Sequence, residues 1–132
     1  MIQDKAGMIT MEEREMMRDY ILLTHIHAMV QKSITDLKYT DNILKKTFEM
    51  CGRVIEDRVI TDMKALRQTL KGNGIVIQNE EHDGFVIRYH FTCRGYQDKF
   101  SMTRDVMKAE ISIKLGKYVG EIGAAIKSQK TT

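Results

Sequence analysis

The stretch that decides the fold is Gly74–Tyr96, GIVIQNEEHDGFVIRYHFTCRGY, which lies between two segments of helical pattern. From Phe85 onward apolar residues alternate with largely polar ones, which is the period of a strand with one buried face. Turn-forming residues fill Asn79–Gly84, and Ile75–Gln78 has the pattern of a short partner strand. We therefore expect an antiparallel β-hairpin, or a three-stranded meander if Tyr96–Phe100 adds a strand.

The segment before the hairpin begins with a helix. Thr10 and Glu13 have the spacing of a capping box at its start. Apolar residues and one histidine then recur at alternating spacings of four and three, which forms a helical stripe: Met16, Tyr20, Leu23, His27, Val30, Ile34 and Leu37. Further apolar residues flank this stripe. Such a helix is either central in its own fold or buried by a second subunit.

Residues 41–71 form either one long helix or two shorter ones. Apolar residues recur at close to the helical period throughout this segment. Thr40 or Asp41 offers an N-cap, and Gly72 has the position of a left-handed C-cap. Because glycine weakens a helix interior by about 1 kcal/mol, we favour two helices divided at Gly52.

The last helix is expected to run from Ser101 or Thr103 toward Lys127. Gly116, Gly120 and Ala124 place small residues at a spacing of four, which permits the close approach of another helix. These elements predict one α+β domain over residues 1–132. It is mainly helical, its hairpin or meander precedes a C-terminal helix, and disordered ends flank an ordered core of about residues 10–127.

Composition is typical of a soluble globular protein. Apolar residues make up 42% and charged residues 30% of the 132 positions. Two cysteines, Cys51 and Cys93, make no disulfide framework, and the richest apolar run is too short and too charged to span a membrane, so we expect a cytoplasmic protein.

Motifs for metal, cofactor or covalent chemistry are missing from the sequence. The two rings of His25 and His27 lie two residues apart on a helix and cannot face one ion. There is no C-x-x-C or H-x-x-x-H spacing, no G-x-S-x-G elbow and no phosphate-binding loop. We therefore expect a non-enzymatic protein that uses neither a metal nor a cofactor.

The order helix, short segment, helix, helix, hairpin, helix is similar to that of winged helix-turn-helix domains. This resemblance implies that residues 57–71 enter the major groove of duplex DNA. The polar face of that helix and of the hairpin supply candidate nucleic-acid contacts: Thr61, Lys64, Arg67, Gln68, Lys71, Arg88 and Arg94. The hairpin tip opposes this hypothesis, because Glu80, Glu81 and Asp83 would repel phosphate.

A homodimeric interaction or structural module without nucleic-acid affinity is the alternative. The apolar excess of the first helix and the small residues of the last one suggest a dimer interface: Met16, Tyr20, Leu23, His27, Val30, Gly116 and Gly120. The partner is then a second copy or another protein, and the acidic tip suits a basic protein surface. The leading hypothesis remains a small regulatory protein that contacts duplex DNA.

Fluorescence anisotropy with a labelled duplex of random sequence distinguishes the two hypotheses. For a DNA-binding protein, log affinity should fall linearly with log salt, by about 0.9 per phosphate neutralised. The slope should flatten in Lys64→Ala, Arg67→Ala and Lys71→Ala. If the folded protein does not bind at low salt, duplex DNA is excluded as the partner.

Overall fold

A computed structural model describes residues 8–130 of the chain, and the side chains of residues 8–124. It contains three helices and three strands in the order α1 Met11–Leu37, α2 Lys45–Gly72, β1 Ile75–Asp83, β2 Val86–Cys93, β3 Tyr96–Thr103 and α3 Arg104–Lys130. The predicted fold class is confirmed, because a three-stranded antiparallel meander precedes a C-terminal helix.

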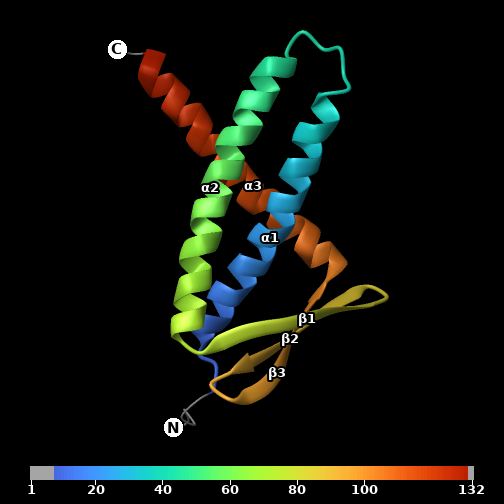
Figure 1. Ribbon diagram of the computed structural model, residues 1–132, viewed down its shortest axis with the longest axis vertical. Coiled ribbons are helices and arrows are strands. Elements are labelled where there is room, and N and C mark those ends of the chain that lie inside the picture. The colour runs from blue at the N-terminus through green and yellow to red at the C-terminus, as the bar shows by residue number, and fades with distance from the viewer. Residues whose placement is uncertain (1–7, 131–132) are drawn as a thin grey trace.

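The three helices and the sheet form an elongated molecule (Figure 1). Helices α1 and α2 lie side by side as an antiparallel hairpin, joined by a loop at the end farthest from the sheet. The sheet covers the opposite end of this hairpin, and α3 starts beside the sheet and crosses the two long helices obliquely. The distal part of the hairpin therefore extends beyond the sheet.

The expected division at Gly52 is wrong, since residues Lys45–Gly72 form one continuous helix. Gly52 faces α1, where an added Cβ would lie 2.9 Å from Ile34 Cγ1. This glycine therefore allows the two helices to approach closely, and it does not end a helix. Without a turn inside α2, the winged-helix order lacks the helix-turn-helix motif that the resemblance implied.

The ends of α2 also differ from expectation. Its N-cap is Leu44 and has no side-chain hydrogen bond, so neither Thr40 nor Asp41 caps the helix. Its C-cap is Asn73, and the left-handed residue that follows is Gly74, with φ +76°, in place of Gly72. By contrast, the predicted capping box of Thr10 and Glu13 is present at the start of α1.

The alternation of apolar and polar residues in β2 gives this strand one buried face, as predicted. Ile87, Tyr89, Phe91 and Cys93 are buried, whereas the residues between them are only half-buried. Both hairpin turns contain two residues. At the first, Gly84 has φ +63°, and at the second both Arg94 and Gly95 have positive φ, which fits the twist of the strands they join.

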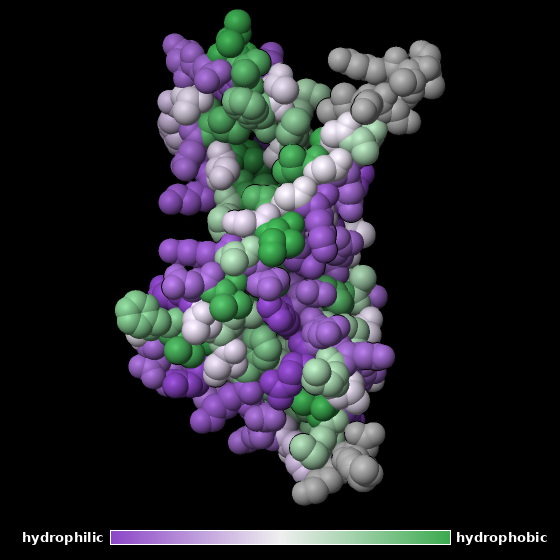
Figure 2. Space-filling model, turned by 180° about the vertical axis from the view of Figure 1, so that it is seen from behind, coloured by the Kyte–Doolittle hydropathy of each residue, from purple (hydrophilic) through white to green (hydrophobic). Residues whose placement is uncertain are grey.

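The hydrophobic core is concentrated at the sheet end of the helical hairpin. The largest fully buried side chains come from α1, α2 and β2, namely Phe91, Met17, Leu22, Leu23, Ile26, Val59 and Cys93. Toward the distal end the core is reduced to residues such as Ile34 and Ile55 between the two helices. Figure 2 shows hydrophobic side chains reaching the surface at that end, beside the crossing α3.

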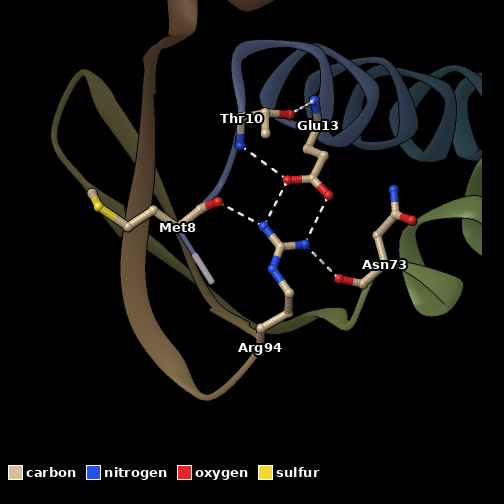
Figure 3. Close-up of polar contacts among 5 residues, drawn as sticks. All are labelled: Met8, Thr10, Glu13, Asn73 and Arg94. Carbon is tan, nitrogen blue, oxygen red and sulfur yellow. Dashed lines mark hydrogen bonds and ion pairs between the residues drawn. The ribbon is translucent and has the colours of Figure 1, made fainter. Parts of the chain in front are cut away.

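One ion pair joins the sheet to the start of α1. The Arg94 guanidinium donates to both carboxylate oxygens of Glu13, at 2.8 and 2.9 Å. It also donates to the carbonyl oxygens of Asn73 and Met8, at 2.7 and 2.6 Å (Figure 3). Glu13 in turn accepts from the backbone N–H of Thr10 at 2.9 Å. One side chain thus connects the second turn of the sheet to both long helices.

This ion pair constrains its neighbours. Arg94 has φ +48°, a left-handed conformation that costs about 1 kcal/mol for a residue with a Cβ. Gly74 packs directly against it, and a Cβ at Gly74 would lie 2.9 Å from Arg94 Cγ. The hydrogen bonds from Arg94 hold the pKa of Glu13 down at about 2, although burial opposes this shift.

Replacing glycines tests the packing role of Gly52. Overpacking costs about 1 to 3 kcal/mol, and alanine gains about 1 kcal/mol of helix propensity. We therefore expect Gly52→Ala to lose about 1 kcal/mol of unfolding free energy. The control is Gly123→Ala in α3, where no atom lies within 4 Å of an added Cβ, and it should gain up to about 1 kcal/mol. Equal gains in urea denaturation would contradict the packing role.

The Glu13 carboxylate should make stability depend on pH in a defined window. Its pKa is lowered from 4.5 to about 2, so its contribution is complete above pH 4.5 and is lost as the pH falls through 2. At neutral pH we expect Glu13→Gln to lose about 3 kcal/mol, and this difference from the wild type should vanish toward pH 2.

The exposed Glu12 provides the matched control for this experiment. Glu12→Gln removes a carboxylate from the same helical turn and should cost less than about 1 kcal/mol. Urea denaturation at several pH values measures both variants. A difference between Glu13→Gln and the wild type that stays constant from pH 7 to pH 2 would show that the ion pair does not stabilise the fold.

Candidate interaction groove

The predicted nucleic-acid contacts of α2 all lie on its exposed surface. The structure brings together on one helix Thr61, Lys64, Arg67, Gln68 and Lys71. Within the described residues, no ion pair involves Lys64, Arg67 or Lys71. This part of α2 is therefore accessible and basic.

The two hairpin arginines are placed differently. Arg88 Nη1 lies 3.0 Å from Asp83 Oδ2 and 3.9 Å from Glu81 Oε1, so the acidic tip neutralises it. Arg94 is held by Glu13 and by two backbone carbonyls. Neither guanidinium extends the basic surface of α2 as a free cation.

Most of the predicted dimer residues belong to the core of a single chain. Leu23 is 1% and Val30 is 8% exposed, and Met16 and Tyr20 pack against this core. His27 is half-buried, and its Nε2 has no hydrogen-bond partner among the described residues. The apolar excess of α1 is thus largely covered by α2, α3 and the sheet.

Unlike the predicted dimer residues of α1, the two predicted glycines of α3 are exposed to solvent. Gly116 and Gly120 are exposed, and a Cβ at either position would meet no atom within 4 Å. Their neighbours Leu115 and Val119 line a hollow at the distal end of the molecule. The small-residue surface of α3 therefore borders a concave apolar region.

This region, called the helical groove below, lies in the angle between α3 and the distal half of the α1–α2 hairpin. It has a volume of about 510 Å³. Its lining comes from all three helices and the loop: Met29, Val30, Ser33, Ile34, Asp36, Leu37, Thr40, Phe48, Cys51, Gly52, Ile55, Leu115 and Val119. Figure 2 shows the hollow and the hydrophobic side chains around it.

Large apolar side chains also project from the loop beside the groove. In the loop between α1 and α2, Tyr39 is 85% and Ile43 is 97% exposed, and Leu44 is 49% exposed. Phe48 follows on α2 and is 45% exposed. These residues were missed in the sequence, although apolar side chains on both sides of the turn formers Asp41 and Asn42 are a detectable signal.

Two tyrosine hydroxyl groups have structural partners. The Tyr118 hydroxyl donates to Asp62, and burial with this carboxylate raises the pKa of Tyr118. Tyr89 bonds to His25 at 2.8 Å, and burial with Glu80 raises its pKa as well. Such neutral phenols act as hydrogen-bond donors that fix the packing of helices and sheet.

Across residues 8–130, no three His, Cys, Asp or Glu side chains come together in a way that could hold a metal ion. Over the same part of the chain, no helix carries an apolar stretch long enough to cross a membrane. The lining of the helical groove is largely apolar and suits contacts with other apolar side chains.

The fold and the groove define a small, mainly helical α+β protein with an apolar concave surface. The chain belongs to the YhjD protein family, whose model matches residues 8–123. This match includes α1, α2, the whole sheet and most of α3. Searches of curated proteins and of solved structures found no match to the chain.

Proposed function

We propose that this protein is a non-enzymatic homodimeric interaction module, in which the helical groove of each chain receives the apolar loop of a second copy. The observation that carries the proposal is the position of the groove directly beside Tyr39, Ile43 and Leu44. The apolar loop and the helical groove lie at the same end of the molecule. A two-fold axis beside that end therefore places the loop of each chain in the groove of the other.

The amount of exposed apolar surface supports a protein partner. Met29, Phe48 and Val119 line the groove and are 50%, 45% and 54% exposed. Together with the exposed loop residues they form a contiguous apolar surface, and such surfaces often mark sites of protein contact. Burying such a surface is favourable by about 25 cal/mol per Å².

The charge at this end favours a second copy as the occupant. The whole chain has a net charge of +3, but residues 36–50 contain three acidic and three basic side chains. Two copies of this end therefore do not repel each other, and Lys45 or Lys46 can face Asp41 across a two-fold axis. The open glycines Gly116 and Gly120 allow α3 of the partner to approach closely.

Duplex DNA binding by a small regulatory protein is the second candidate function. The observation in its favour is the exposed basic surface of α2 with Lys64, Arg67 and Lys71. Against this function, the fold contains no turn within α2 that would form a helix-turn-helix motif, and Arg88 and Arg94 form ion pairs with carboxylates. The salt series described above tests this function separately from dimerisation.

Replacing Ile43 by serine tests the dimer. Ile43 is 97% exposed in one chain, so Ile43→Ser should leave the monomer folded. Each dimer contains the substitution twice, and each site loses the burial of one side chain, so the dissociation constant should rise by about 100-fold. Sedimentation equilibrium over a range of protein concentrations measures this constant.

Phe85→Ser is the matched control, because Phe85 is 83% exposed but lies at the first turn of the sheet. It should leave the dissociation constant unchanged. A second readout is the thiol of Cys51, which lines the groove, whereas Cys93 is buried. Alkylation of Cys51 should slow as the protein dimerises. A wild-type chain that stays monomeric at about 100 μM would overturn the proposal.

A further inference from the structure

A second open surface lies at the sheet end of α2, away from the helical groove. The sheet order is β1-β2-β3, so β1 is an edge strand, and no strand among the described residues pairs with its outer side. Alternate residues of such a strand direct their N–H and C=O groups to the open side. This edge therefore offers hydrogen bonds to an extended main chain.

A hollow of about 470 Å³ adjoins the first residues of this edge. It lies where the strand leaves the two long helices, and its lining consists of Tyr20, Arg67, Leu70, Lys71, Ile75, Val76 and Ile77. Leu70 and Ile75 are 4% exposed, whereas Val76 is 56% exposed. The edge and the hollow thus form one surface with an apolar floor.

Two cations give this surface its charge preference. Arg67 and Lys71 are one helical turn apart and exposed, and neither forms an ion pair within residues 8–124. No acidic residue lines the hollow. The carboxylates of Glu81 and Asp83 lie at the far end of β1, where His90 and Arg88 contact them. The start of β1 is therefore a positive site that lacks a carboxylate.

We propose that the open edge of β1 binds an extended acidic segment of a partner protein, which adds as a strand beside β1 and places one carboxylate side chain on Arg67 and Lys71. Strand addition uses the unpaired main-chain groups, and pockets for alternate side chains give selectivity. Because the helices cover one face of the sheet, every second side chain of the added strand faces α2. A phosphodiester could contact the same cations, but it would leave the backbone groups of the edge unused.

Peptide binding tests this proposal. The probe is a fluorescein-labelled, C-terminally amidated octapeptide of alternating valine and threonine with one central glutamate, measured by anisotropy at low salt. Its first twin carries glutamine in place of glutamate, and its second is N-methylated at every residue so that neither edge of its main chain can pair with β1. We expect the glutamate peptide to bind, the glutamine twin to bind at least about tenfold more weakly, and the methylated twin not to bind.

Variants of the protein locate the site. Arg67→Gln and Lys71→Gln should each weaken binding of the glutamate peptide by about tenfold. Lys64→Gln is the matched control, since Lys64 is an exposed cation of the same helix that does not line the hollow, and it should change affinity by less than about twofold. Equal binding of the glutamate and glutamine peptides, equal losses in all three variants, or no binding would each overturn the proposal. Ile43→Ser should bind the peptide like the wild type, so this test is independent of dimerisation.

Discussion

The contact between Arg94 and Glu13 is the constraint on which the arrangement of sheet and helices depends. Its two hydrogen bonds, at 2.8 and 2.9 Å, join the second turn of the sheet to the first turn of α1. The same guanidinium reaches the Asn73 carbonyl just after α2, so a single side chain fixes three segments. Since Glu13 is only 7% exposed, loss of Arg94 would leave a carboxylate that water cannot fully solvate. This contact occurs together with a left-handed backbone conformation at Arg94. It also occurs with a glycine at position 74, where a Cβ would lie too close to the arginine side chain.

The distal half of the molecule is less densely packed than the half next to the sheet. There α1 and α2 have only each other and part of α3 to pack against, and the core is reduced to a narrow seam. At Gly52 the two helices approach closely, but the space between them and α3 stays unfilled. What remains is an apolar groove beside an apolar loop. In our proposed dimer, the second copy covers these side chains.

Sequence reasoning predicted those features that depend on local pattern. The alternation in β2, the capping box of Thr10 and Glu13 and the helix after the sheet are all present. It failed at Gly52, because a glycine needed for helix contact has the same local appearance as one that ends a helix. The ion pair between Arg94 and Glu13 could not be predicted, because the two residues are far apart in sequence and the pattern around each of them does not point to the other. The groove was missed for a related reason, as its lining comes from three helices whose crossing is set by tertiary packing.

The separation between Arg94 and Glu13 also bears on the order of folding. The α1–α2 hairpin and the meander are built from neighbouring segments, whereas this contact joins residues 81 positions apart. Closing so long a loop has an entropic cost that local pairs avoid, so the two halves can form before they dock. The ion pair then belongs to the late steps, and its strength governs mainly how slowly the sheet separates from the helices once the protein has folded.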